Sequence, residues 1–177
     1  GSSPNKLAVV LKGEVKDVNH ISEGNYILGS NLVNNKPYWL QKAGSEAIWY
    51  DKNFQNWKIG HESNLGSGSG ARMLSYRGTG ATALPQEATP WQYLKDGEWT
   101  PSEDIIIVSI PSKLNVILKG EVKDVNHISE GIYILGSNLV NDKPFWLQET
   151  GTDAIWYDKN FQNWKIGHES NLGSGSG

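Results

Sequence analysis

The sequence predicts an all-β protein, an antiparallel meander that closes as a small barrel or sandwich and occurs as tandem repeats. Short segments rich in β-branched and aromatic residues alternate with turn residues, at intervals of about 8 to 12 residues. Apolar residues nowhere recur at helical spacing over three turns, so helix should be scarce. Residues 6–70 return almost unchanged as residues 113–177, an offset of 107.

The repeat divides the chain into three segments, called here A (residues 6–70), B (71–112) and A′ (113–177). Residues 1–5 form an N-terminal arm whose opening Gly-Ser-Ser-Pro resembles a cloning remnant. A and A′ differ at nine of 65 positions, which indicates a recent duplication. No second B follows A′ in this sequence, so we expect one complete repeat, residues 6–112, and a truncated second copy.

Five short strands are expected in A, at residues 7–15, 25–29, 36–41, 47–51 and 56–60. The second and third flank an Asn34-Asn35 turn, and Pro37 should push the third towards an edge of the sheet. The fourth and fifth form a hairpin around residues 52–55.

B supplies further strands at residues 72–77, 91–94 and 105–110. Asp96-Gly97 stands between aromatic segments and predicts a tight hairpin that returns through Glu98-Trp99. Residues 78–90 contain two prolines and are expected to form a loop. Because A alone would have exposed strand edges, B is expected to cover them.

Composition argues against several classes of function. A net charge of −3 without clusters of Lys or Arg disfavours binding to nucleic acid or to an anionic membrane. No apolar run approaches the roughly 20 residues of a membrane-spanning helix, so no membrane insertion is expected. The chain has no cysteine and no Asn-x-Ser/Thr acceptor, and both absences favour an intracellular or bacterial-type setting.

Short aromatic motifs follow one another along the repeat: Gly24-x-Tyr26, Asn35-Lys36-Pro37-x-Trp39, Ile48-Trp49-Tyr50-Asp51, Trp57-x-Ile59, Trp91 and Gly97-Glu98-Trp99. Together they resemble small Trp-rich modules that are repeated in many protist and invertebrate proteins. The resemblance covers about residues 24–101 and again 131–167, with Asn35 and Asp142 where those modules have glycine. It implies an appended binding or interaction unit and carries no particular activity.

The residues 49–57 form the candidate ligand site. Because side chains alternate along a strand, Trp49 and Asp51 share one face and Ile48 and Tyr50 the other. If Ile48 and Tyr50 face the core, Trp49 and Asp51 point outward, where an indole could stack on a sugar and the carboxylate could bond hydroxyls. The alternative is that the tryptophans fill the core and Asp51 starts the turn. The candidate residues of both copies are Trp49, Asp51, Asn53, Trp57, Trp156, Asp158, Asn160 and Trp164.

No catalytic or metal motif stands out. The four histidines are two positions seen twice, and His61-Glu62 would point apart on a strand, so surface histidines are expected and no metal site. Carboxylate pairs suited to glycoside hydrolysis depend on spatial separation, and nothing in the sequence singles one out. The Gly-Ser run of residues 66–70 lacks the lysine and helix of a phosphate loop and is typical of a flexible connector.

Two hypotheses of function follow, and both are non-enzymatic. The first is a tandem binding module without cofactors, whose aromatic and polar patches take a carbohydrate or a protein surface with avidity. The second is an assembly repeat that self-associates through exchange of repeat halves, since B can pair with A or with A′ and leaves the other open. An enzyme is the third and least favoured reading.

Overall fold

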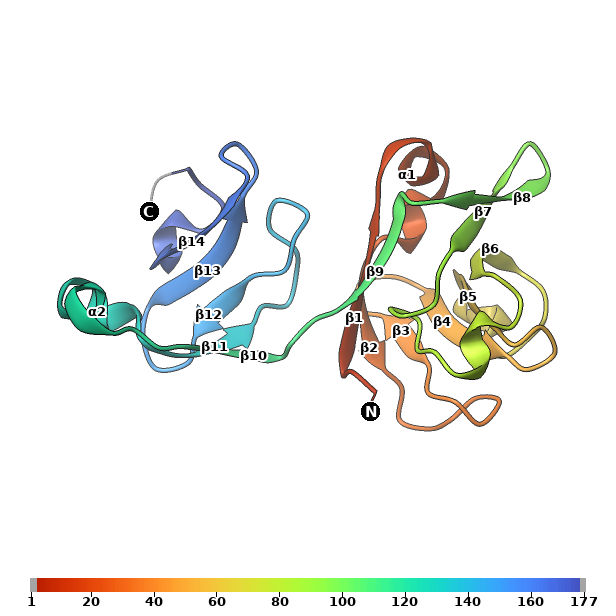
Figure 1. Cartoon of the computed structure of the whole chain (residues 1–177), viewed down its shortest axis with the longest axis horizontal. Coiled ribbons are helices and arrows are strands. Elements are labelled where there is room, and N and C mark those ends of the chain that lie inside the picture. Colours follow the sequence, from red (N-terminus) through yellow and green to blue (C-terminus); the bar gives the residue numbers. More distant parts are fainter. Residues whose placement is uncertain (1–2, 176–177) are drawn as a thin grey trace. The chain divides into compact units, whose positions relative to one another are not determined.

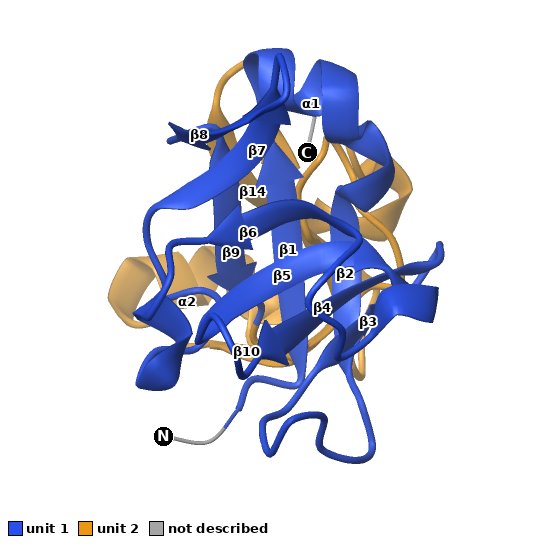
Figure 2. Ribbon diagram, turned by 90° about the vertical axis from the view of Figure 1, so that its right-hand side faces the viewer, with its two compact units in different colours: residues 1–110 blue, residues 111–177 orange. Residues whose placement is uncertain are grey.

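The computed structural model describes residues 3–175 and divides into two compact units, residues 1–110 (unit 1) and 111–177 (unit 2). Figure 2 distinguishes the two units by colour. The division falls two residues before the expected end of B. Residues 1–2 of the expected arm lie outside the described residues, but Pro4 accepts a hydrogen bond from Trp39 Nε1 at 2.9 Å.

Unit 1 is a nearly closed, barrel-like antiparallel sheet (Figure 1). Its strands are β1 (Lys6–Leu11), β2 (Gly24–Leu28), β3 (Trp39–Gln41), β4 (Glu46–Asp51), β5 (Asn56–His61), β6 (Ala71–Ser75), β7 (Trp91–Lys95), β8 (Glu98–Ser102) and β9 (Ile105–Ser109). Each strand from β1 to β7 pairs with the next, and β9 returns to pair with β1, so β8 and β9 are the two ends of the sheet. The expected all-β meander is therefore confirmed, and B supplies β6 to β9.

The core of unit 1 lies inside this sheet. Strand alternation turns Leu7, Val9 and Leu11 of β1 inward, where they meet Ile105 and Ile107 of β9. The other strands contribute the buried residues Tyr26, Trp39, Ile48, Tyr50, Trp57, Ile59, Met73, Trp91 and Tyr93, and Val15 and Ala88 join them from outside the strands. Residues from both A and B thus share one core, and neither segment completes it alone.

Two expectations about A are wrong in detail. The strand predicted for residues 7–15 ends at Leu11, and helix α1 (Gly13–Asn19) follows, then a 3₁₀-helix, η1 (His20–Ser22). Gly13 has a φ of +55°, a left-handed backbone conformation that interrupts the extended strand and that glycine adopts readily. Pro37 does not mark an edge strand, because β3 begins two residues later and lies between β2 and β4.

The expected turns are confirmed. Asn34 and Asn35 have φ values of 53° and 64°, and Val33 and Lys36 bridge across them. Asp96 and Gly97 have φ values of 52° and 81° in a two-residue connection between β7 and β8. Positive φ at both central residues is the geometry that matches the twist of a hairpin. The short helices η2 (Glu62–Asn64) and η3 (Thr79–Ala81) lie in the longer connections.

Unit 2 has the same elements as A and forms a five-stranded curled sheet. They are β10 (Lys113–Val116), α2 (Gly120–Asn126), η4 (His127–Ser129), β11 (Gly131–Leu135), β12 (Trp146–Gln148), β13 (Asp153–Asp158), β14 (Asn163–His168) and η5 (Glu169–Asn171). The strand order follows the chain, so β10 and β14 are the two edges. Their counterparts in unit 1, β1 and β5, are both interior strands because B pairs with them.

Candidate functional site

The β4–β5 hairpin does not present the expected ligand platform. Trp49 and Trp57 are each 0% exposed and Asp51 is 2% exposed, so the expectation that Trp49 and Asp51 point into solvent is wrong. Only Asn53, in the loop after β4, is exposed. In this conformation three of the four candidate residues of A have no surface to offer a ligand.

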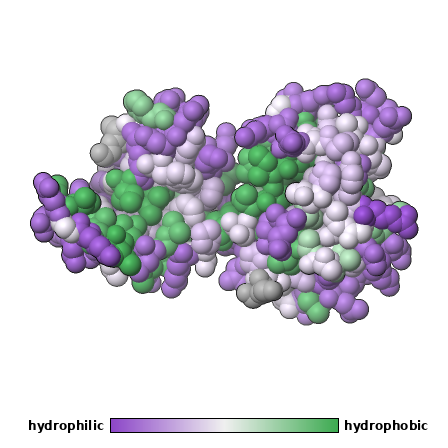
Figure 3. Space-filling model, viewed as in Figure 1, coloured by the Kyte–Doolittle hydropathy of each residue, from purple (hydrophilic) through white to green (hydrophobic). Residues whose placement is uncertain are grey.

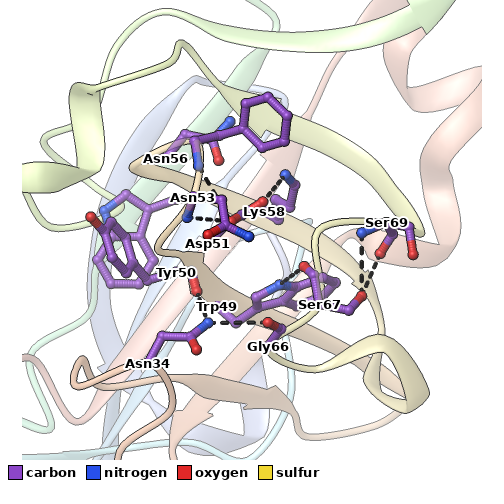
Figure 4. A network of polar contacts seen from close by, with 12 residues as sticks. Asn34, Trp49, Tyr50, Asp51, Asn53, Asn56, Lys58, Gly66, Ser67 and Ser69 are labelled. Carbon is purple, nitrogen blue, oxygen red and sulfur yellow. Dashed lines mark hydrogen bonds and ion pairs between the residues drawn. The ribbon is translucent and has the colours of Figure 1, made fainter.

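The Gly-Ser run is the reason that Trp49 is buried. Residues 66–70 fold back over the outer face of β4, and Ser67 accepts a hydrogen bond from Trp49 Nε1 at 3.0 Å (Figure 4). Asn34 Nδ2 donates to the carbonyl oxygens of Tyr50 and Gly66, at 2.7 and 3.1 Å, and ties the run to β4. This segment is therefore a cover with fixed contacts, and the expectation of a flexible connector is wrong.

Asp51 organises the turn that follows β4. Its carboxylate accepts from the backbone N–H of Asn53 at 2.8 Å and forms a buried ion pair with Lys58 Nζ at 2.6 Å (Figure 4). Burial alone would raise the pKa of Asp51. The hydrogen bonds from Lys58, Asn53 and Phe54, with the positive charge of Lys58, outweigh burial and lower the pKa. Asp51 matches the alternative reading, a residue that starts the turn.

Trp57 packs on the inner face of the sheet in unit 1. Its ring meets Trp39 and Tyr50 edge to face, with centroids 5.9 and 5.6 Å apart. Its Nε1 donates to the carbonyl of Ala83, a residue of B, at 2.8 Å. Two different segments of the chain are therefore needed to bury this tryptophan.

In unit 2 the four corresponding candidate residues differ from those of unit 1 in which side chains are buried. Trp156 and Asp158 are buried, at 0% and 2% exposure, and Asn160 is exposed, as in unit 1. Trp164 is 50% exposed, although its counterpart Trp57 is fully buried. One of the predicted residues thus becomes a surface residue only where B is missing.

Other residues, like Trp164, are exposed in unit 2 although their counterparts in unit 1 are buried, and they were not among the candidates chosen from the sequence. Ile166 is 43% exposed against 0% for Ile59, and Val122 of α2 is 55% exposed against 1% for Val15. We call Val122, Trp164 and Ile166, with the edge strands β10 and β14, the open face of unit 2. Apolar residues gather on the surface of unit 2 beside α2 in Figure 3. Their own sequence is unchanged, so the signal for these residues was that residues 71–112 have no second copy within residues 1–177.

B covers the corresponding face of unit 1 with specific bonds. Ser75 of β6 accepts from Trp57 N through its Oγ and from Asn56 Nδ2 through its carbonyl, both at 2.9 Å. Arg72 Nε reaches the buried carboxylate of Glu46 at 2.7 Å. The face is thus built to be covered by a segment that brings both strands and polar partners.

Unit 1 also has a hollow on its outer surface, over β5 to β8. Its volume is about 560 Å³. Three half-exposed apolar side chains line it, those of Phe54, Leu94 and Trp99, at 43%, 43% and 39% exposure. Lys58 and Arg77 line it too and lie over the Phe54 ring, 4.8 and 5.2 Å from its centroid.

The histidines considered as possible metal ligands or proton carriers do not form a site among residues 3–175. His20, His61, His127 and His168 are all exposed, and His61 Nδ1 accepts from Ser63 N at 3.1 Å. Among residues 3–175 no three His, Cys, Asp or Glu side chains gather in a way that could hold a metal ion. No helix within that range is long and apolar enough to span a membrane.

Comparison with known proteins gives no relative: no protein-family model, no curated protein and no solved structure matches this sequence. The resemblance to Trp-rich repeat modules therefore stays a prediction.

Proposed function

We propose that this protein is a non-enzymatic assembly module, in which an A-type segment is completed by B-type strands of another molecule. A-type segments are residues 6–70 and 113–175, and the B-type strands are β6 to β9 of residues 71–110. Association of units is then the function itself, and A′ is the part of the chain that recruits.

One observation carries the proposal: the same sequence is buried in one copy and exposed in the other. Trp57, Ile59 and Val15 are each at most 1% exposed, and their counterparts Trp164, Ile166 and Val122 are 43% to 55% exposed. Fully burying a side chain of this size contributes about 1.5–3 kcal/mol, so three half-exposed ones leave a substantial driving force unused. An exposed apolar surface of this kind is typical of an interaction site.

The open face also offers backbone groups. In unit 1, β5 pairs with β6 on its outer side and β1 with β9, but β14 and β10 are sheet edges. Edge strands present unpaired N–H and C=O groups that a further strand can bond. Main-chain bonds of this type give affinity in strand addition, and side-chain pockets give specificity.

The face keeps its geometry without a partner. Trp146 and Trp164 lie 5.9 Å apart, the same centroid distance as Trp39 and Trp57 in unit 1. Tyr157 and Trp164 lie 5.4 Å apart, against 5.6 Å for Tyr50 and Trp57. A preformed site loses little ordering entropy when its partner binds, which favours recruitment.

Light scattering on a sizing column tests the proposal, with residues 1–177 and 1–110 compared over a range of concentrations. We expect the longer chain to grow in mass with concentration, because open faces associate through their free strand edges and exposed apolar side chains, and the shorter one to stay monomeric. Val122→Asp should weaken association because the counterpart Val15 is buried in the core that A and B share. Val125→Asp is the matched control: Val125 is 72% exposed and its counterpart Val18 is also exposed, at 59%. A longer chain that stays monomeric throughout would refute the proposal.

A second candidate function is ligand binding in the hollow of unit 1. It is favoured by Trp99, whose ring is exposed beside Leu94 and Phe54 with Lys58 and Arg77 alongside. Apolar walls with a few polar groups are common in small-molecule sites, and a sugar could stack on the indole. A glycan screen with the whole protein and with Trp99→Ala tests this. Binding that is unaffected by Trp99→Ala would exclude the hollow.

A further inference from the structure

Copies of residues 1–177 can exchange their B segments, but the numbers of A-type and B-type segments limit what this exchange can achieve. The 177 residues hold two A-type segments and one B, and A already uses that B in the folded protein. A copy that gives its B to the A′ of another copy leaves its own A open. A and A′ agree at all but nine of 65 positions, so the exchange gains no contacts. Exchange can therefore lengthen an assembly but cannot close its open faces.

We infer that the partner that closes A′ is a B-type segment, one with the strand pattern of residues 71–110 that is not already paired with another A-type segment. The inference rests on the proposed function and names the partner of the same open face. Unit 1 supplies the template for this partner, because it contains the complete set of contacts between an A-type segment and B.

The β5–β6 pairing of unit 1 gives the register in which a donor strand would pair with the β14 edge. In unit 1, β5 pairs with β6 through Ile59 opposite Met73, with Met73 fully buried. Ile166 occupies the position of Ile59 in β14, and its side chain is the one left 43% exposed. A donor Met73 opposite Ile166 would bury both side chains and pair the free edge of β14.

The β1–β9 pairing of unit 1 gives the register in which a donor strand would pair with the β10 edge. β1 pairs with β9 through Leu7, Val9 and Leu11, opposite Ser109, Ile107 and Ile105 respectively. Their counterparts in A′ are Leu114, Val116 and Leu118, unchanged in sequence. Every core-facing position that meets β9 is therefore identical in the two copies, and the changes at this edge fall on the outward positions, Asn115 and Ile117.

The polar contacts agree with the strand registers. Five described side chains of A contact B by hydrogen bonds or ion pairs: Glu14, Lys36, Glu46, Asn56 and Trp57. Four are identical in A′, and only Glu46 differs, since Asp153 stands in its place. Asp153 keeps the carboxylate that Arg72 of a donor would meet, on a side chain one methylene shorter. A′ thus retains the recognition residues for B.

A donor peptide of residues 71–110 added to the full-length protein tests this. The protein has no cysteine, so Ile117→Cys in the protein and Ile106→Cys in the peptide introduce one reporter pair. Ile106 is opposite Val10 in unit 1, and Val10 corresponds to Ile117. Paired residues lie about 5.5 Å apart between Cα atoms, within reach of a disulfide. We expect cross-linking, and a mass that falls to that of one protein molecule plus one peptide.

Two controls make the result specific. A peptide with Val108→Cys would be diagonal to position 117, about 7–8 Å away, and should cross-link at least tenfold more slowly. Equal rates for the two peptides would overturn the register. If no peptide cross-links but a protein with both Ile106→Cys and Ile117→Cys cross-links without peptide, the protein's own B fills A′. The inference that A′ needs a second B-type segment is then wrong.

A second form of the experiment avoids dependence on an isolated peptide. A protein extended after Gly177 by another copy of residues 71–110 should remain monomeric at concentrations where the 177-residue form associates. An extended protein that associates as readily as the original would overturn the inference. The proposed function fails on different evidence, namely a 177-residue protein that never associates, because cross-linking to the peptide is scored independently of mass.

Discussion

Ile59 and Ile166 provide the sharpest measure of what B contributes, because they are the same residue in the same local sequence. Ile59 is 0% exposed and Ile166 is 43% exposed. Replacing Ile59 with Ala removes three buried carbon groups, worth about 2.4 kcal/mol at 0.8 kcal/mol each. A cavity term adds to this, within the range of about 2–5 kcal/mol seen for such changes.

Ile166→Ala should cost less. Scaling the transfer value by the buried fraction of Ile166 gives about 1.4 kcal/mol, and an open site leaves no closed cavity. The transfer terms differ by about 1 kcal/mol, and the cavity at Ile59 adds about as much again. We therefore expect a difference of about 2 kcal/mol between the two variants, which is roughly 30-fold in the equilibrium constant for opening.

Amide hydrogen exchange followed by NMR can measure both costs in the full-length protein. Exchange of the β4 amides reports opening of unit 1, and exchange of the β13 amides reports opening of unit 2. The protein should be dilute enough to be monomeric by light scattering. Equal costs for the two variants would refute the reasoning, since they would mean that B does not bury Ile59 more deeply than Ile166. With the donor peptide bound, the cost of Ile166→Ala should rise towards that of Ile59→Ala.

Three further predictions concern unit 1. Lys58→Met should destabilise it by about 3–5 kcal/mol because Asp51 is left as a buried, unpaired charge. The matching change in unit 2, Lys165→Met, should cost less, since the Lys165 side chain is 20% exposed against 3% for Lys58. Urea unfolding that is monitored separately for each unit compares the two costs. The pKa of Asp51 is lowered on folding, so its contribution is present above the unfolded value of about 3.8 and is lost as pH falls through the folded value. Asp51→Asn should therefore reduce the loss of stability between pH 5 and the acid range, and an unchanged pH profile would contradict this. Gly60→Ala should cost about 1–3 kcal/mol, because a Cβ there would lie 2.5 Å from the carbonyl oxygen of Gly70; thermal unfolding that matches the unchanged protein would show that the cover can move aside.

Much of the fold could be predicted from local sequence. The Asp96-Gly97 and Asn34-Asn35 turns follow from residues that tolerate positive φ, and the alternation of β-branched residues in β1 and β9 follows from a face buried on one side. Helix α1 was missed because seven residues are too few to establish helical periodicity against a preceding apolar strand.

The candidate site was harder to predict, for a reason visible at Trp49. Alternation correctly separates Trp49 from Ile48 and Tyr50, but it cannot reveal that residues 66–70 cover the outer face. That cover depends on one indole hydrogen bond to Ser67 and on the side chain of Asn34, contacts between residues 18 and 32 positions apart. Sequence composition reports the freedom of an isolated Gly-Ser run and says nothing of the surface on which it lies.

The open face of unit 2 has a different origin. Trp164 and Trp57 have identical neighbours in sequence, and their exposures differ only because of a segment elsewhere in the protein. No property of the local residues could separate them. The repeat boundary, by contrast, could be read directly from the sequence, whereas the sequence left open whether the 65 residues of A′ form a complete unit by themselves.

The Gly-Ser cover over Trp49 also has a practical consequence for protein engineering. A run such as Gly66-Ser67-Gly68-Ser69-Gly70 is where one would ordinarily insert a tag, join a fusion partner or place a protease site. Here an insertion between Ser67 and Gly68 would displace the carbonyl that accepts from Trp49 Nε1 and would uncover a buried indole. The tip of the β7–β8 hairpin at Asp96-Gly97 is the better place for a tag, because a Cβ at Gly97 meets nothing within 4 Å.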